Sequence, residues 1–201
     1  SGDELVEVDA TPLAHQIRRS NAYALQAAMR ELGWEASAFH LNDTREDVLH
    51  ELNLLMQDYD VLILSGGVSK GKFDFIPDAL KELGVTKLFH QVSQRPGKPF
   101  WFGTSENKVV FALPGNPVST FLCFYRYIKP WIRSNMGVKS NELTAILTSA
   151  IEFKPALTYF LQVHATYDQG KLMATPVPGG GSGDFANLKA VNGFLELPAD
   201  R

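Results

Sequence analysis

The stretch Asp60-Val-Leu-Ile-Leu64 runs directly into Ser65-Gly-Gly-Val-Ser69, and this junction decides the fold. A short uninterrupted apolar run is typical of a strand that is buried on both faces of a parallel sheet. In open α/β sheets ligands bind beyond the carboxyl ends of such strands, and glycines there let the backbone approach a phosphate closely. The junction therefore predicts an α/β fold and a phosphate-binding loop at Ser65, Gly66, Gly67, Ser69 and Gly71. A plain glycine turn is the competing interpretation, since the loop matches neither the Walker nor the dinucleotide pattern.

Helical and extended patterns alternate on both sides of this strand, which is the arrangement of a layered α/β domain. Apolar spacing predicts helices over residues 16–32, after a cap at Asn42 or Asp43, and over 75–83. Extended segments are predicted over residues 34–41, 87–92, 100–103 and 109–113. A helix with an aromatic stripe follows Pro117; core packing explains the stripe better than cofactor stacking, because a helix that covers a sheet needs an apolar face.

Beyond Gly137 the pattern changes to short β-type runs and turns, with strands predicted over 143–147, 159–167, 172–176 and 193–197. This change predicts two domains, an α/β domain over residues 1–137 and a small β-rich domain over residues 138–201. About 60 residues is near the lower limit for an independently stable core. We therefore expect the second domain to depend on the first.

Composition excludes several classes of function. The 201 residues carry a formal net charge of -3 without a polycationic segment, which argues against capture of nucleic acid or anionic lipid. Cys123 is the only cysteine, so disulfides and cysteine metal clusters are excluded and a reducing compartment such as the cytoplasm is expected. The apolar runs are much shorter than the ~20 residues of a membrane helix. A start without Met, inside a loop-like motif, suggests part of a longer polypeptide.

A second candidate loop is Leu113-Pro-Gly-Asn-Pro-Val-Ser119, where a strand leads through a tight turn into a helix. A helix N-terminus offers free N–H groups to an anion, which makes Pro114, Gly115, Asn116 and Ser119 candidate ligand-binding residues. Helix capping alone is the alternative. Between the two loops, the prolines of the segment Gln94-Arg-Pro-Gly-Lys-Pro99 project the cations Arg95 and Lys98. These cations suit a phosphate or oxyanion, although a solvated surface turn would look the same.

Acidic residues fall where predicted elements begin or end, at Glu4, Asp43 and Asp74. If the strands are parallel neighbours, these carboxylates converge on one edge of the sheet. Converging carboxylates beside phosphate loops would suit Mg²⁺, which takes one or two carboxylates together with substrate oxygens. Helix capping explains Asp43 and Asp74 equally well. The five histidines show no metal-ligand spacing, and nucleophilic hydrolysis is disfavoured because the Gly-x-Ser-x-Gly elbow is missing.

Taken in order, these motifs resemble the MoeA family, the molybdopterin molybdenumtransferases, to which the gephyrin E domain also belongs. The motifs that carry the resemblance are Ser-Gly-Asp-Glu-Leu5, Ser20-Asn21, Asp43, Ser65-Gly-Gly-Val-Ser69, Asp74, Arg95-Pro-Gly-Lys-Pro99, Leu113-Pro-Gly-Asn-Pro-Val-Ser119, Gly180-Gly-Ser-Gly183 and Gly193-Phe-Leu-Glu-Leu-Pro198. The resemblance implies a three-layer molybdopterin-binding α/β domain of the MogA/MoeA type and a small C-terminal β-barrel-like domain. It also implies that the family's N-terminal domains, and the first strand of the α/β domain, are missing from this chain.

The resemblance further implies the reaction. Molybdenum from molybdate would be inserted into adenylylated molybdopterin with Mg²⁺ participating and AMP released, by a homodimer of the full-length chain, so this portion should be inactive alone. Glu4, Asp43 and Asp74 match the family's catalytic acidic residues, and Asp43 and Asp74 its metal ligands. The residues that match cofactor-binding positions are those of the Ser65–Gly71 loop, Arg95, Lys98, Pro114, Gly115, Asn116, Ser119 and Ser182.

The chain departs from the family at several cations. Basic residues are replaced at Gln91, Leu157 and Gln162, whereas Lys70 and Lys72 are added beside the glycine loop. Losing a charge-assisted contact to an oxyanion weakens its binding considerably. Two hypotheses therefore stand: an active transferase, which we favour because the acidic residues and both loops are intact, and a catalytically weakened molybdopterin-binding or scaffold module. A pterin-binding domain of the MogA or CinA type is disfavoured by the C-terminal β-domain.

Overall fold

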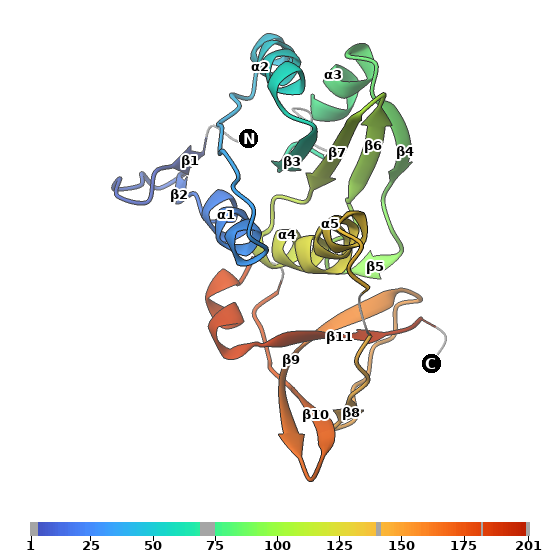
Figure 1. Ribbon diagram of the computed structural model, residues 1–201. Helices are drawn as coiled ribbons and strands as arrows, with labels where there is room; N and C mark the ends of the chain where they lie inside the picture. The colour runs from blue at the N-terminus through green and yellow to red at the C-terminus, as the bar shows by residue number, and fades with distance from the viewer. Residues whose placement is uncertain (1–3, 69–74, 140–141, 182, 200–201) are drawn as a thin grey trace. The chain divides into compact units, whose positions relative to one another are not determined.

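A computed structural model describes residues 4–68, 75–139, 142–181 and 183–199 (Figure 1). Its internal contacts group the chain into two units, each described by itself below. The first unit comprises Ser1–Gln91 and Pro99–Gly115, and the second comprises Val92–Lys98 and Asn116–Arg201. The domain boundary at residues 137 and 138 stays a prediction.

A mixed sheet forms the centre of the first unit, with strand order β3-β7-β6-β4. The strands are β3 (Val61–Ser65), β7 (Lys108–Leu113), β6 (Trp101–Ser105) and β4 (Thr86–His90). As expected from its apolar run, β3 pairs in parallel with β7. The β6–β4 and β6–β7 pairs are antiparallel. For β6 and β7 the cause is the connection of only two residues, Glu106 and Asn107, which makes a hairpin.

Two amphipathic helices supply the core on one face of this sheet. Helix α2 (Arg45–Asp58) buries Val48 and Leu52, and helix α3 (Ile76–Glu82) buries Ile76, Ala79 and Leu80. These side chains pack against the sheet residues Leu62, Leu64, Val110 and Ala112 in one apolar cluster. Burying a leucine of this kind stabilises the fold by about 1.5–3 kcal/mol, so these contacts hold the helices on the sheet.

Side chains of alternate strand residues point to the opposite face, where aromatic rings meet. Phe111 of β7 lies with its ring centroid 4.9 Å from that of Phe102 and stacks at 6.5 Å with Phe100. Phe89 of β4 adds edge and tilted contacts at 5.4 and 5.5 Å. Cross-strand aromatic pairs of this kind fix the register of the hairpin.

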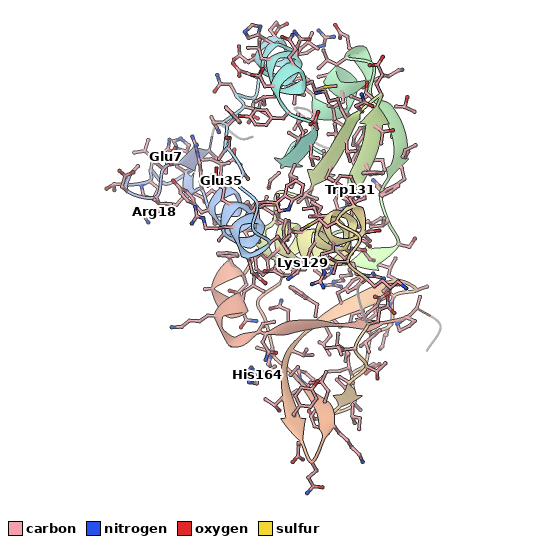
Figure 2. All side chains as sticks on the ribbon, in the orientation of Figure 1. Glu7, Arg18, Glu35, Lys129, Trp131 and His164 are labelled. Carbon is pink, nitrogen blue, oxygen red and sulfur yellow. The ribbon has the colours of Figure 1, made fainter. Side chains whose placement is uncertain are left out.

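The start of the first unit differs from the sequence prediction in two places. The helix expected from residue 16 begins later, as α1 (Asn21–Glu31), because Ile17 and Arg18 form strand β2, which pairs in parallel with β1 (Leu5–Val6). Glu7, labelled in Figure 2, accepts a hydrogen bond from the Tyr23 hydroxyl of α1 and forms an ion pair of 2.8 Å with Arg19, which follows β2.

The strand predicted over residues 34–41 is wrong: no strand is assigned there, and these residues take no part in the sheet of the described chain. An extended segment needs a hydrogen-bonded neighbour, which alternation of side chains cannot supply. The predicted cap of α2 is also wrong, because Thr44 caps this helix, accepting a hydrogen bond of 3.2 Å from the Asp47 N–H. A Ser or Thr directly before the first turn commonly takes this role.

A long helix that is interrupted by a wider turn begins the larger part of the second unit. It consists of α4 (Pro117–Cys123), the π-helical turn η1 (Phe124–Ile128) and α5 (Lys129–Asn135). Pro130 cannot donate a backbone hydrogen bond and its ring crowds the carbonyl one turn earlier, which explains a π turn at this point. The Lys129 ammonium lies 4.7 Å from the centroid of the Tyr125 ring on the preceding turn.

The β-rich part of the second unit is organised by the long strand β9 (Thr158–Asp168). The strand order is β11-β9-β10-β8, and β5 (Gln94–Arg95) also pairs with β9, in parallel. The remaining strands are β8 (Ile146–Leu147), β10 (Lys171–Pro176) and β11 (Gly193–Leu197), with a 3₁₀ helix η2 (Phe185–Ala190) before the last. The predicted strands at 159–167, 172–176 and 193–197 are confirmed. The strand predicted at 143–147 is shorter in the structure.

Across the described residues, every helix is too short or too polar to cross a membrane.

Candidate functional site

The first candidate loop leaves the sheet at Ser65, the last residue of β3. Gly66 and Gly67 follow in the left-handed region, with φ values of +88° and +69°. Glycine adopts this conformation without steric cost, so the chain makes a tight turn here, which agrees both with a phosphate-binding loop and with a plain glycine turn. The phosphate-binding role stays a prediction, and Ser69, Gly71 and Asp74 lie outside the described residues.

The second loop begins at Pro114 and Gly115, directly beside the first. Register pairs Ser65 with Leu113, so parallel strands β3 and β7 end together, and the Gly66 N–H donates to the Leu113 carbonyl at 3.1 Å. A Cβ built on Gly115 would lie 3.6 Å from the Gly66 Cα, which is van der Waals contact. The two loops therefore lie side by side where β3 and β7 end.

Asn21 links the two loops. It is the first residue of α1, and its side-chain Nδ2 donates hydrogen bonds of 2.8 Å both to Ser65 Oγ and to the Gly115 carbonyl. Its Oδ1 is buried and accepts no hydrogen bond from the described residues. An unsatisfied buried oxygen costs about 1–3 kcal/mol, so it is a favourable acceptor for a donor on a bound molecule.

Asn21 is the functional candidate that reasoning from single residues missed. It stood only among the motifs of the family resemblance, because an Asn at a helix start is ordinarily a cap. In the structure the cap position is Ser20, which makes no side-chain capping bond, and the Asn21 amide is used across the fold instead. The sequence did carry one signal for this role: Asn21 belongs to a family motif although α1 does not need it as a cap.

The acidic candidates in the described chain are Glu4 and Asp43. Glu4 is exposed before β1, and its carbonyl accepts the Ile17 N–H at 2.8 Å. Asp43 is partly buried in the bend before Thr44 and already has an interaction partner. The described residues contain no group of three or more His, Cys, Asp or Glu side chains placed to hold a metal ion. The Mg²⁺ site at Asp43 and Asp74 therefore stays a prediction.

The cations Arg95 and Lys98 belong to the second unit, in the turn between β5 and Pro99. Both are exposed, and neither forms an ion pair with a described residue, whereas Gln94 and Gly97 in the same turn are buried. Surface cations without a local carboxylate remain available for an anion. Their assignment to phosphate binding stays a prediction.

Asn116 and Ser119 also lie in the second unit. Asn116 is at the N-cap position of α4, as predicted, although it makes no side-chain capping hydrogen bond. Its carbonyl accepts hydrogen bonds from the Thr120 N–H at 2.9 Å and the Thr120 hydroxyl at 3.1 Å. Ser119 is only 3% exposed, so its predicted ligand contact would require an enclosed oxyanion. Ser182 lies outside the described residues.

Comparison with known proteins now adds to this geometry. Residues 1–134 match the family model described as "Probable molybdopterin binding domain", and residues 144–201 match the model "MoeA C-terminal region (domain IV)". The chain belongs to the MoeA family. The predicted family and the predicted fold class are both confirmed.

Relatives with the name molybdopterin molybdenumtransferase align along almost the entire chain. The protein from Synechocystis sp. is 42% identical over 202 residues, and that from Bacillus subtilis is 32% identical over 204 residues. Each alignment covers 98% of this chain but only 50% and 47% of the relative. The chain thus spans about half the length of the curated relatives it matches.

Solved MoeA structures have the same fold. Two structures of the molybdopterin biosynthesis MoeA protein from Pyrococcus horikoshii match with TM-scores of 0.77 and 0.75 and identities of 27% and 25%. They cover 98% and 100% of this chain, and the matched region is 48% of each Pyrococcus chain. The mixed α/β unit and the β-rich part of the chain therefore have the fold of this half of MoeA.

Gln162 and Gln91 are two of the three positions where the family resemblance predicts a cation. The Gln162 Oε1 accepts a hydrogen bond of 3.0 Å from Asn187 of η2, and an added Cβ on Gly179 would lie 3.3 Å from the Gln162 Nε2. Gln91 adopts a left-handed φ of +72° after β4. The Gln162 and Asn187 amides, which are both neutral, thus link β9 to η2.

Proposed function

We propose that this chain forms the pterin-binding part of a molybdopterin molybdenumtransferase that acts in molybdenum cofactor biosynthesis. In the reaction, molybdenum from molybdate is inserted into the dithiolene of adenylylated molybdopterin, and water hydrolyses the pterin–adenylate anhydride to the pterin phosphate and AMP. Support comes from the relatives of that name, which align with 98% of the chain. Because those relatives are about twice as long, the proposal concerns the full-length protein.

The observation that carries this proposal is the Asn21 link between the loops at Ser65 and Gly115. The left-handed Gly67 lets a phosphate approach the backbone closely, and its N–H and the Ser65 hydroxyl could bind the phosphate oxygens, whereas the Gly66 N–H already donates to the Leu113 carbonyl. The buried Asn21 Oδ1 can accept a hydrogen bond, and pterin rings carry N–H donors. This combination favours a molecule with both a phosphate and a polar ring.

Three further features belong to the proposal. Asp43 and Asp74 would hold Mg²⁺ with oxygen ligands, and the ion would neutralise charge on the substrate phosphates when bound. Glu4 would act with them as a catalytic carboxylate. The full-length protein would work as a homodimer in the cytoplasm.

The alternative function is a molybdopterin-binding or scaffold module with weakened catalysis. Gln162 favours it, because the MoeA cation expected there is replaced by an amide that is already hydrogen-bonded to Asn187. A neutral amide binds an oxyanion much less strongly than a guanidinium, which offers charge and several donors. This module would bind the pterin and release little or no AMP.

Reconstitution of the full-length protein with adenylylated molybdopterin, molybdate and Mg²⁺ decides between these functions. We expect AMP release that depends on molybdate, and we expect Asp74→Asn to abolish it without changing the thermal midpoint. Asp168→Asn, at the exposed end of β9, is the matched control and should leave turnover unchanged. Tight pterin binding without AMP release would refute the transferase and support the module.

A further inference from the structure

The turn that presents Arg95 and Lys98 is anchored from its buried side. Exposure alternates along it: Arg95 and Lys98 are exposed, whereas Gln94 is only 3% exposed and Gly97 is buried. The Val92 N–H donates to the Lys98 carbonyl at 3.0 Å, which closes the turn. β5 pairs with β9 in the register Gln94 to Thr158, so the turn begins at a fixed point on the sheet.

The Gln94 amide holds the middle of this turn. Its Nε2 donates to the Pro96 carbonyl at 3.0 Å and lies 4.0 Å from the Cys123 Sγ. The Cys123 thiol in turn donates to the Gly97 carbonyl at 3.9 Å. A Cβ on Gly97 would come within 2.7 Å of the Gln94 Nε2 and 2.8 Å of the Cys123 Sγ, so only glycine fits against them.

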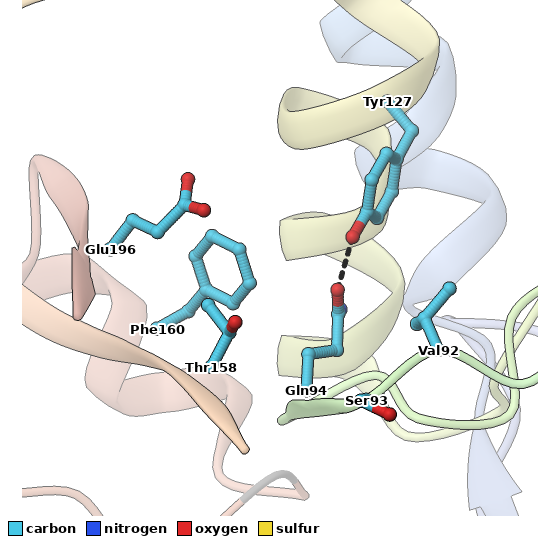
Figure 3. Close-up of a pocket in the computed structure, with 7 residues that line it drawn as sticks. All are labelled: Val92, Ser93, Gln94, Tyr127, Thr158, Phe160 and Glu196. Atoms are coloured by element: carbon cyan, nitrogen blue, oxygen red, sulfur yellow. Dashed lines mark hydrogen bonds between the residues drawn. The ribbon is translucent and has the colours of Figure 1, made fainter. Parts of the chain in front are cut away.

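Tyr127 sets which way this amide faces. Its hydroxyl, on the π-helical turn η1, donates a hydrogen bond to the Gln94 Oε1 (Figure 3). With the oxygen held by Tyr127, the nitrogen must point at the Pro96 carbonyl, because the reversed amide would place two oxygens together. Burial raises the pKa of Tyr127 above its ordinary value, so the hydroxyl keeps its proton and remains a donor at neutral pH.

The pair borders a cavity of about 270 Å³ in the second unit. Val92, Ser93, Thr158, Phe160 and Glu196 complete its lining, as Figure 3 shows. The Glu196 carboxylate forms an ion pair of 3.0 Å with the Arg126 guanidinium of η1. The cavity leaves room for Gln94 or Tyr127 to turn away if their mutual hydrogen bond is lost, so the bond is needed to keep the amide in place.

We propose that Gln94 and Tyr127 are positioning residues that orient the Arg95–Lys98 turn for an anionic group of the ligand. Neither touches the anion; Tyr127 fixes the Gln94 amide, Gln94 fixes the Pro96 carbonyl, and the flanking cations are thereby directed outward. The identity of the anion as a phosphate of adenylylated molybdopterin rests on the proposed function. The anchoring of Arg95 and Lys98 by Gln94 and Tyr127 does not rest on that proposed function.

The test compares full-length wild type with Gln94→Met, which keeps length but removes the amide, and with Tyr127→Phe, which removes only a hydroxyl. Inorganic pyrophosphate is the probe, titrated by calorimetry at constant salt. We expect Gln94→Met to weaken pyrophosphate binding about tenfold, Tyr127→Phe about threefold, and the double variant no more than Gln94→Met, because interacting residues are non-additive. Glu196→Gln, which lines the same cavity but forms its ion pair with Arg126, should bind as wild type does.

If Gln94 acts by positioning Arg95 and Lys98, the effect of Gln94→Met on pyrophosphate binding should require these two cations. General destabilisation of the fold would not require them. In an Arg95→Ala/Lys98→Ala background, Gln94→Met should have no further effect on pyrophosphate binding. Unaltered pyrophosphate affinity in both single variants, with only a lower thermal midpoint, would overturn the proposal in favour of plain core packing. So would a wild type that does not bind pyrophosphate, or a Gln94→Met effect that persists without the two cations.

Enzyme kinetics supplies an independent readout. If AMP release occurs, both variants should raise the KM for adenylylated molybdopterin by the same factors and leave kcat within about twofold, as loss of uniform binding does. A fall in kcat at unchanged KM would contradict positioning. If wild type releases no AMP but binds pyrophosphate in a manner that depends on Gln94, the transferase proposal fails and the positioning proposal stands.

Discussion

The side-chain amide of Asn21 lies 2.8 Å from the hydroxyl oxygen of Ser65, although 44 residues separate them in the chain. The same nitrogen lies 2.8 Å from the Gly115 carbonyl, so one NH₂ group spans the ends of β3 and β7. Both loops thereby depend on the first turn of α1 for their spacing. A ligand that contacts both would be sensitive to this single side chain.

Asn21→Ala should therefore separate the loops and weaken binding of the pterin. The change removes a partly buried hydrogen bond to Ser65 and an exposed one to Gly115, which together contribute about 1–3 kcal/mol of stability. We expect a lower thermal midpoint and a pterin Kd raised about tenfold or more, since the change removes the Oδ1 acceptor as well. Fluorescence titration of the full-length protein with molybdopterin measures the Kd.

The matched control is Asn135→Ala in the last turn of α5. Its amide makes one exposed hydrogen bond of 2.8 Å, to the Trp131 carbonyl. A bond of that kind contributes little, so its loss should change stability by less than about 1 kcal/mol and leave pterin binding intact. Equal effects of the two variants would show that Asn21 has no special role.

Gly66→Ala should impair the first loop through its backbone. At φ +88° an alanine pays about 1–2 kcal/mol for the left-handed conformation, and the loop would relax away from the Leu113 carbonyl. Gly33→Ala is the control, since Gly33 has φ +78° and no atom within 4 Å of an added Cβ. Similar thermal shifts are expected for both, but only Gly66→Ala should raise the pterin Kd.

The sequence predicts the parts of the fold that local chemistry determines. The apolar runs of β3 and β7 and the Gly84 that follows α3 require no distant partner to be recognised. Segment 34–41 shows the limit, because alternation there is present without a neighbouring strand to complete it. Short turns were the neglected signal: the two residues Glu106 and Asn107 already imply the antiparallel β6–β7 pair.

The candidate site likewise has residues that the local sequence predicts and residues that it does not. The loop at Ser65 and Gly66 was predictable because consecutive glycines after a buried strand indicate a tight turn or a close approach of the backbone to a ligand. Asn21 and Gln94 were not, since an amide reveals its role only through partners distant in sequence, here the Gly115 carbonyl and the Tyr127 hydroxyl. The role of a buried polar side chain follows from its hydrogen-bond partners, and those partners are known only once the chain is folded.

Cys123 predicts how stability depends on alkaline pH. Burial raises the pKa of its thiol to about 12, whereas an unfolded cysteine has a pKa of about 8.5. Above about pH 8.5 the unfolded chain releases this proton first, so the contribution to stability is full below that pH and is lost as the pH rises toward about 12. The expected slope is at most about 1.4 kcal/mol per pH unit.

Urea unfolding of wild type and Cys123→Ala between about pH 8 and pH 10 isolates this contribution, because other titrating groups are common to both. Cys123→Ala should be less stable at pH 8 owing to lost packing, and the difference should shrink as the pH rises. Parallel pH profiles would contradict a buried neutral thiol. In the native protein the thiol should also resist disulfide reagents that react with it after unfolding.

Gln162→Arg tests whether the replaced cations limit catalysis. The change breaks the 3.0 Å hydrogen bond from Asn187 but puts a guanidinium where the MoeA resemblance expects a basic residue. If an oxyanion is bound at this position, one charge-assisted contact should raise kcat/KM for AMP release about tenfold, which corresponds to about 1.4 kcal/mol. His164→Arg, two residues further along β9 and exposed, adds the same charge as a control and should change little. If Gln162→Arg leaves AMP release unchanged, the position does not meet the oxyanion, and neutral residues on β9 are then compatible with full activity.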